Sequence, residues 1–275
     1  DTLDGGLGAD TMIGGLGNDT YHVDNALDIV MELPDEGYDT IISQVDYTLA
    51  KNAEHLILEA GSNATHATGN ELDNHIIGNE TDNVIDGGMG ADLMDGGHGN
   101  DYYILDNEFD TVIEHFAADS GTDTLEQHID RPFYNFDEFG NPIKTGSYHQ
   151  LFDNVENLIL KSTAKTVFGN ALDNIITLNE QNNFVNALSG NDTIIYQKGG
   201  GRDTILSTDS LESKDTLAIH GYDLSEAMFV RVTNTASNHD MLQIRFKGTN
   251  DQITLIDYFA EQVDGFDNRM DEITF

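Results

Sequence analysis

The stretch GGMGADLMDGGHGND, from Gly87 to Asp101, decides the fold of this chain. It contains two consecutive copies of a nine-residue unit, G-G-x-G-x-D-x-U-x, in which U is a large apolar residue, and it places Asp92 and Asp101 nine positions apart. A second doublet, GGLGADTMIGGLGNDTY, repeats the pattern from Gly5 to Tyr21. Four copies in one phase predict a repetitive structure rather than an isolated glycine-rich turn.

The residue types in each copy predict a turn that binds a hard cation and is followed by a short strand. Glycines let the backbone turn sharply and direct several carbonyl oxygens into one concavity, and the aspartate in the sixth position adds an anionic oxygen beside them. The apolar residue two positions later (Met12, Tyr21, Met94 or Tyr103) is expected to point inward from the strand. Each nonapeptide then divides into six residues of turn and three of strand.

This nonapeptide resembles the RTX, or haemolysin-type, calcium-binding repeat. The resemblance implies an all-β fold, a parallel β-roll or β-helix solenoid, with several calcium ions as its cofactor. With two nonapeptides per turn, loops two repeats apart stack and share an ion, which gives roughly six to ten ions for the paired loops. The candidate ligands are the glycines Gly5, Gly6, Gly8, Gly14, Gly15, Gly17, Gly87, Gly88, Gly90, Gly96, Gly97 and Gly99, and the aspartates Asp10, Asp19, Asp28, Asp39, Asp92, Asp101, Asp110, Asp123, Asp192, Asp203 and Asp215.

The stacking rule also predicts which loops lie against each other. In the first block it pairs the loop 5–10 with 23–28, and 14–19 with the loop ending at Asp39. In the second block, 87–92 pairs with both 69–74 and 105–110, and 96–101 pairs with both 78–83 and the loop ending at Asp123. In the third block, the loop ending at Asn183 pairs with the loop ending at Asp203, and the loop ending at Asp192 pairs with the loop ending at Asp215.

The phase of the repeat divides the chain into segments. Residues 1–130 carry two blocks of the β-roll, residues 131–150 are expected to form an inserted loop, residues 151–215 carry a third block, and residues 216–275 are expected to form a C-terminal β cap. The insertion is either a binding loop or a passive surface excursion. Between the first two blocks, residues 41–68 are expected to continue as strands without metal turns. In the cap, a helical turn is expected to open at Ser225.

Two variations in the pattern bear on metal binding. Asparagine replaces the sixth-position aspartate at Asn74 and Asn83, where it either supplies a neutral oxygen to an ion or forms hydrogen bonds between stacked turns. In addition, the stretch GLGNDTYHVDNALDIVME, which begins at Gly15, matches GHGNDYYILDNEFDTVIE, which begins at Gly97. This match indicates that a longer unit overlies the nonapeptide.

The composition is strongly acidic, with 50 Asp and Glu against 12 Lys and Arg and a net charge of -38. Such a chain repels itself without counterions, so we expect a largely disordered calcium-free form that folds when cations bind. The same charge argues against nucleic acid and anionic membrane surfaces as partners. A solubilising or halophilic surface is the alternative explanation, but it does not require many aspartates to share one phase.

The absence of cysteine excludes disulfides, zinc–thiolate sites and thiol catalysis, which leaves oxygen-bound metal as the expected cross-link. No apolar run approaches the length of a membrane span, and no signal peptide opens the chain. Because the sequence begins in mid-pattern and ends on DEITF, we expect it to be part of a longer protein. Calcium suits many flexible oxygen ligands better than magnesium does, and extracellular calcium levels fill sites that the cytosol leaves empty.

The resemblance implies a secreted or cell-surface bacterial protein that leaves the cell unfolded through a type I secretion apparatus. Within it, the repeats are expected to act as a calcium-triggered folding module and stiff spacer of a large adhesin whose own ligand is left open. The alternative is the same module in a secreted lipase, protease, polysaccharide-modifying enzyme or pore-forming toxin.

No enzyme is expected within this chain. The motifs HExxH and GxSxG, a P-loop and a GxGxxG after a strand do not occur, and His22, His98 and His220 suit surface or packing positions. Some parallel β-helices that act on acidic polysaccharides also use calcium, but they need basic residues to neutralise the uronate. Between Asp1 and Gly140 the sequence offers only Lys51 and Arg131.

Overall fold

The computed structural model describes residues 1–114, 121–128, 132–136, 142–150, 152–161, 165–206, 209–210, 213–234, 239–256, 258–259, 266–267 and 270–275. The chain forms two compact units, residues 1–128 with 152–155 and residues 129–151 with 156–275. Each is described by itself.

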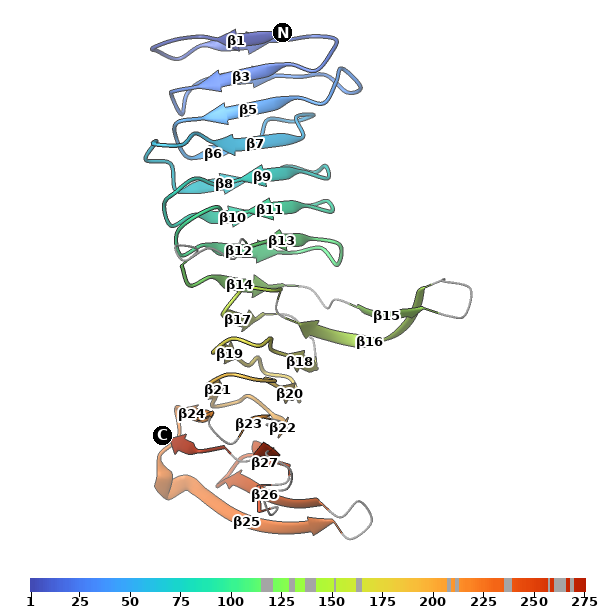
Figure 1. Ribbon diagram of the computed structural model, residues 1–275, viewed down its shortest axis with the longest axis vertical. Coiled ribbons are helices and arrows are strands. Elements are labelled where there is room, and N and C mark those ends of the chain that lie inside the picture. The colour runs from blue at the N-terminus through green and yellow to red at the C-terminus, as the bar shows by residue number, and fades with distance from the viewer. Residues whose placement is uncertain are drawn as a thin grey trace. The chain divides into compact units, whose positions relative to one another are not determined.

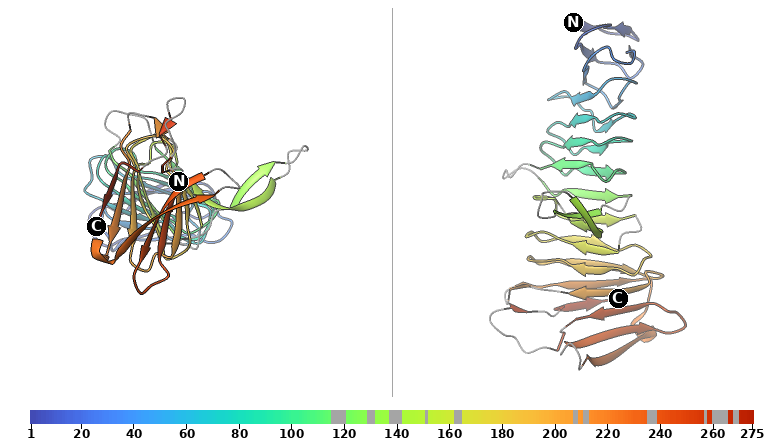
Figure 2. Two further views of the ribbon diagram at one scale, coloured as in Figure 1. Left: turned by 90° about the horizontal axis from the view of Figure 1, so that it is seen from below. Right: turned by 90° about the vertical axis from the view of Figure 1, so that its right-hand side faces the viewer.

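The first unit is a parallel β-solenoid whose strands stack turn upon turn (Figures 1 and 2). Alternate strands β1, β3, β5, β7, β9, β11 and β13 form one sheet, β6, β8, β10, β12 and β14 follow one another in a second, and β2 pairs with β4. The strands are β1 (Thr2–Asp4), β2 (Thr11–Ile13), β3 (Thr20–Val23), β4 (Ile29–Met31), β5 (Thr40–Ser43), β6 (Tyr47–Thr48), β7 (His55–Leu58), β8 (His66–Thr68), β9 (His75–Ile77), β10 (Val84–Asp86), β11 (Leu93–Asp95), β12 (Tyr102–Leu105), β13 (Thr111–Ile113) and β14 (Thr124–Gln127).

The register of the sheets confirms that one turn contains two nonapeptides. Leu93 of β11 lies opposite His75 of β9 on one side and Thr111 of β13 on the other, two nonapeptides away in each direction. Two turns are longer than this: Thr20 pairs with Thr40, and Tyr102 with Thr124. The strands β5 to β8 also confirm that residues 41–68 continue the solenoid.

The apolar residue two positions after each aspartate lies inside the solenoid, as predicted. Tyr21, Met94 and Tyr103 are fully buried and Met12 is 4% exposed. Because parallel register places like positions above one another, these side chains stack into one continuous core; each large apolar side chain so buried contributes about 1.5–3 kcal/mol. The core fixes the strands, and the glycine-rich loops between them carry the candidate ligands.

The second unit continues the same parallel pattern and adds antiparallel strands. Its sheets run β17-β19-β21-β24-β29 and β15-β16-β18-β20-β22-β27-β26-β25, and β23 pairs with β28. The elements are β15 (Pro132–Phe136), β16 (Pro142–Gln150), β17 (Asn157–Leu160), β18 (Thr166–Phe168), β19 (Ile175–Thr177), β20 (Phe184–Asn186), β21 (Thr193–Gln197), β22 (Arg202–Leu206), β23 (Asp209–Ser210), β24 (Thr216–His220), η1 (Leu224–Glu226), β25 (Ala227–Asn234), β26 (His239–Phe246), β27 (Gln252–Leu255), β28 (Phe266–Asp267) and β29 (Glu272–Thr274).

The structure adds detail to one local prediction and corrects another. Within the predicted insertion, β15 and β16 form an antiparallel pair (Figure 1), and the last residues of β16 pair in parallel with β18. The helical turn is the 3-10 helix η1, in which Asp223 rather than Ser225 is the N-cap and Glu226 completes a capping box. A helix long and apolar enough to cross a membrane does not occur in the part of the chain that the structure describes.

Candidate metal centre

The glycines of the loop 87–92 are required by its conformation and by its neighbours. Gly88 has a φ of 75° and Gly90 a φ of 128°, values that L residues rarely adopt. A Cβ on Gly90 would lie 2.2 Å from the carbonyl oxygen of Leu72 in the preceding turn. A Cβ on Gly87 would lie 2.6 Å from Oδ2 of Asp92, because the carboxylate folds back over the first glycine of its own loop.

A ladder of hydrogen bonds joins the sixth positions of successive turns. The backbone N–H of each sixth residue donates to Oδ1 of the aspartate in the loop that stacks on it. These bonds run from Asp10 to Asp28 (3.0 Å), Asp19 to Asp39 (2.8 Å), Asn74 to Asp92 (2.7 Å), Asn83 to Asp101 (2.7 Å), Asp92 to Asp110 (3.1 Å), Asp101 to Asp123 (2.8 Å), Asn174 to Asp192 (2.8 Å), Asn183 to Asp203 (2.8 Å) and Asp192 to Asp215 (3.1 Å). The loops therefore stack in the predicted pairs.

The second oxygen divides the aspartates into two classes. In the four glycine loops of the doublets, Oδ2 of the aspartate is buried and has no hydrogen-bond partner; these residues are Asp10, Asp19, Asp92 and Asp101. In the loops 23–28 and 105–110, which lack glycine, Oδ2 accepts two backbone N–H groups. Those donors are Asp24 (3.3 Å) and Asn25 (3.2 Å) for Asp28, and Asp106 (3.1 Å) and Asn107 (2.9 Å) for Asp110.

The orientation of one peptide group accounts for the difference. In the glycine loop 87–92, the N–H of the second residue, Gly88, donates to Oδ1 of Asp86 (3.1 Å) and not to the sixth-position aspartate. Gly97 donates in the same way to Asp95 (3.1 Å). In the glycine-free loop 105–110 the corresponding N–H, that of Asp106, donates to the aspartate. Positive φ at the second glycine thus leaves the carboxylate without the donor that would satisfy it.

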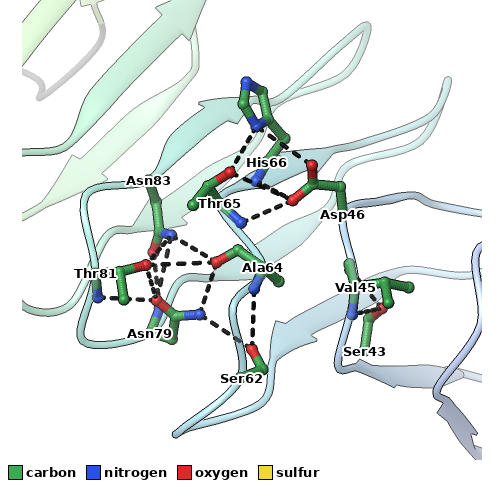
Figure 3. Close-up of polar contacts among 10 residues, drawn as sticks. All are labelled: Ser43, Val45, Asp46, Ser62, Ala64, Thr65, His66, Asn79, Thr81 and Asn83. Atoms are coloured by element: carbon green, nitrogen blue, oxygen red, sulfur yellow. Dashed lines mark hydrogen bonds and ion pairs between the residues drawn. The ribbon is translucent and has the colours of Figure 1, made fainter.

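The sixth-position asparagines Asn74 and Asn83 are satisfied within the protein. The side-chain amide of Asn83 donates to the carbonyl of Ala64 (3.4 Å) and to Oδ1 of Asn79 (3.3 Å), and its oxygen accepts the backbone N–H of Asn79 (2.8 Å; Figure 3). Asn74 makes the equivalent contacts with Asn70 and the carbonyl of Ala53. These two asparagines therefore form hydrogen bonds between stacked turns, the second of the two alternatives, because their amide N–H groups donate to carbonyl oxygens of the neighbouring turn.

Burial shifts the ionisation of the unsatisfied carboxylates. Removal from water raises the pKa of Asp92 to about 8; the hydrogen bond from Asn74 opposes this rise, and the charge of Asp110 adds to it. Desolvation likewise raises the pKa of Asp101 to about 7 and that of Asp203 to about 8. Without a cation, these groups gain from holding a proton in the folded state.

The remaining predicted aspartates are also buried in the stack. Asp39 and Asp203 each have a buried Oδ2 without a hydrogen-bond partner, as in the glycine loops, and Asp123, Asp192 and Asp215 are buried members of the ladder. The assignment of calcium to Asp28 and Asp110 stays a prediction, and both oxygens of these two carboxylates already accept protein N–H groups.

Two glutamates that the sequence analysis did not single out join these aspartates. Glu32 lies with Asp19 and Asp39, and Glu114 with Asp101 and Asp123; within each group, one carboxylate oxygen per residue lies within 4.8 Å of the others. The signal that could have found them is the match between the stretches that begin at Gly15 and Gly97, because it aligns the two glutamates. They were missed because both stand in loops without the glycine pattern. In addition, each glutamate comes more than one nonapeptide later in the sequence than the glycine-loop aspartate that lies beside it in the structure.

The unsatisfied carboxylates and the glycine backbone around them suit a hard cation such as calcium, which binds several carboxylate and carbonyl oxygens at once. A comparison with protein families agrees with this chemistry: the family model of the RTX calcium-binding nonapeptide repeat, in four copies, matches residues 1–24, 68–103 and 168–205. No curated protein matched the chain. The three matched segments contain both glycine doublets and the loops that end at Asn74, Asn83, Asn174 and Asn183. These segments belong to the RTX calcium-binding nonapeptide repeat family.

Proposed function

We propose that this chain is a calcium-triggered folding module of a secreted or surface-attached protein. The observation that carries the proposal is the set of buried aspartate oxygens without a hydrogen-bond partner in the glycine loops. Burying an unpaired carboxylate costs several kcal/mol. Between Asp1 and His128 the sequence contains a single Lys or Arg, the exposed Lys51, so basic side chains do not supply the missing charge there.

The residues that would hold calcium are the glycine-loop aspartates Asp10, Asp19, Asp92 and Asp101 together with backbone carbonyl oxygens of their loops. Calcium would supply the positive charge that the buried oxygens lack. The protein's part is to present the carboxylates before the ion arrives: the ladder fixes Oδ1 of Asp92 and Asp101, and the glycine conformation keeps N–H donors away from Oδ2. Since the oxygens converge only when the turns stack, binding and folding are coupled.

The role proposed for the module is that of a spacer in a large adhesin, exported unfolded by a type I secretion apparatus. A solenoid in which each turn contacts only its neighbours suits a stiff spacer. A net charge of -38 favours an expanded chain where calcium is scarce, which suits passage through an export channel. We propose a structural and binding role, not a catalytic one. Tandem extracellular β domains elsewhere in the polypeptide would support the adhesin, whereas a catalytic motif there would support a secreted enzyme or toxin.

Calcium titration of the chelated chain tests the folding switch. Followed by far-ultraviolet circular dichroism, the chain is expected to pass cooperatively from a disordered to a β signal as calcium rises to extracellular levels. Magnesium at the same concentration should not replace calcium, because magnesium requires a compact octahedron and keeps its waters. A full β signal in excess chelator at neutral pH would show that the apolar core and the asparagine ladder suffice, and the metal-coupled mechanism would be wrong.

A further inference from the structure

Two clusters of three carboxylates lie in the first unit, and in each of them a glutamate joins the sixth-position aspartates of two stacked loops described above. One consists of Asp19, Glu32 and Asp39, the other of Asp101, Glu114 and Asp123. All six side chains are buried; the two glutamates, at 6% for Glu32 and 9% for Glu114, are the most exposed of them. The second cluster repeats the first along the match that begins at Gly15 and Gly97, with a shift of two positions for the last aspartate, so the arrangement has been built twice.

Each glutamate stands where a loop of the RTX pattern would begin with glycine. β13 pairs with β11 at Asp95 opposite Ile113, so the next residues, Gly96 and Glu114, are stacked neighbours. In the first cluster, β4 pairs with β2 in the same way and brings Glu32 to Gly14. The loop that comes later in the chain therefore has, in each pair, a carboxylate side chain at the position where a glycine loop offers only backbone.

A tyrosine hydroxyl holds each glutamate in place. Tyr103 donates its hydroxyl hydrogen to Oε1 of Glu114 and accepts the backbone N–H of Gly96 (2.7 Å). Tyr21, Glu32 and Gly14 repeat these contacts. The first glycine is needed for this approach, because a Cβ on Gly96 would lie 2.2 Å from Oδ2 of Asp101 and 2.3 Å from the hydroxyl oxygen of Tyr103. One oxygen of the glutamate is thus fixed by the tyrosine, and the other is left for a ligand.

The oxygens left over are buried and unsatisfied. Neither glutamate has a hydrogen-bond partner for its second oxygen, Oε2 of Glu32 or Oε2 of Glu114. The same is true of Oδ2 in Asp19, Asp39 and Asp101. Three carboxylates held this close repel one another strongly unless a cation or protons lie between them. Among the residues of the first unit, Lys51 is the sole Lys or Arg and is exposed, so it does not neutralise either cluster. The N-terminal ammonium of Asp1 pairs with Oδ1 of Asp19 and leaves Oδ2 of Asp19 without a partner.

We propose that each cluster is a calcium site of a second kind, in which a glutamate side chain joins the aspartates of two stacked loops as a ligand of one ion. Glu32 and Glu114 are ligands, and Tyr21 and Tyr103 are positioning residues that orient them. This inference deepens the proposed function and rests on it. Because three negative charges exceed the charge of calcium, these two sites are expected to bind trivalent lanthanide ions more tightly than calcium.

The double variant Glu32→Gln with Glu114→Gln tests the assignment. Glutamine keeps the size of the side chain and removes the buried charge, so the calcium-free variant should fold at least as readily as the calcium-free parent. Calcium bound per chain, measured by equilibrium dialysis and elemental analysis, is expected to fall by two, or the affinity for two ions to fall at least roughly tenfold. The matched control is Glu71→Gln, which removes an exposed glutamate from the same unit and should leave the count unchanged.

Terbium luminescence gives a second readout, since the chain has no tryptophan and tyrosine alone sensitises the ion. Terbium emission excited through tyrosine should drop strongly in the double variant Tyr21→Phe with Tyr103→Phe, while the number of bound ions stays the same. An unchanged calcium count in the double glutamine variant would overturn the inference and leave the calcium-binding module intact. Failure of the parent chain to bind calcium at all would instead overturn the proposed function.

Discussion

Lowering the pH from about 8 to about 5 is expected to shift the calcium-free protein toward its folded state and, with calcium present, to raise the calcium concentration needed to fold it. Both effects come from the buried carboxylates. Desolvation raises the pKa of Asp92 and Glu114 to about 8 and that of Asp101 to about 7, above the values of about 4 that these side chains have in an unfolded chain.

The sign follows from proton counting. Between about pH 4 and about pH 8, the folded calcium-free protein binds more protons at these carboxylates than the unfolded chain does. The free energy of unfolding therefore falls as the pH rises through this window, and the buried carboxylates oppose folding most above their folded pKa values. Calcium needs the same carboxylates in the ionised form, so protons compete with calcium for them. The calcium concentration at which half of the protein is folded therefore rises on acidification.

Circular dichroism in excess chelator, recorded across this pH range, measures the first effect, and calcium titrations at the two ends measure the second. Protonation also reduces the net charge of -38, so monovalent salt at the higher pH is the control. Salt screens repulsion between exposed charges but not the cost of burying Asp92 or Glu114. If salt alone reproduced the folding seen at low pH, surface repulsion would be the cause. A calcium-free chain that unfolds further on acidification would contradict the prediction directly.

The repetitive part of the fold was accessible from the sequence because one short pattern sets both the backbone and the core. Glycines at fixed positions demand particular turns, and the apolar residue two places after each aspartate must then fall on the inner face of a short strand. Met94 and Tyr103 lie there for this reason. The same phase predicted which loops stack, since turns of two nonapeptides each leave little freedom of register.

The functional roles of single oxygens were not accessible in this way. Asp92 and Asp110 occupy the same position of the repeat, yet Oδ2 of Asp110 accepts two N–H groups and that of Asp92 accepts none. The cause is the orientation of the N–H group four residues earlier, at Gly88 or Asp106, which depends on whether glycine permits a positive φ. Glu114 escaped prediction because it occupies the position of Gly96 one turn later, where the repeat pattern expects a glycine and no ligand side chain.

The substitution Gly90→Ala is expected to lower the free energy of unfolding by several kcal/mol and to raise the calcium concentration at the midpoint of folding. The substitution Gly8→Ala should lower the free energy of unfolding much less. Both glycines occupy the fourth position of their loops, with φ values of 128° and 133°. Strain at such a φ costs about 1–3 kcal/mol in either loop. The surroundings differ: a Cβ at position 90 would lie 2.2 Å from the carbonyl oxygen of Leu72, whereas at position 8 the nearest atom, Oδ2 of Asp10, is 3.8 Å away.

A clash with a backbone carbonyl cannot be relieved by a side-chain rotation, so Gly90→Ala must push two turns apart or change the loop conformation. Overpacking of this kind adds about 1–3 kcal/mol. The ladder bond between the N–H of Asn74 and Asp92 (2.7 Å) crosses the same gap, so separation of the turns also moves a candidate ligand. Urea unfolding in saturating calcium measures the loss of stability, and calcium titration measures the midpoint. Gly61→Ala, at a φ of 80° with no atom nearer than 4.0 Å, controls for strain inside the stack. Equal losses of stability in all three variants would mean that glycine is required at these positions only by the backbone φ. Close stacking of the loops would then not set the geometry of the calcium sites.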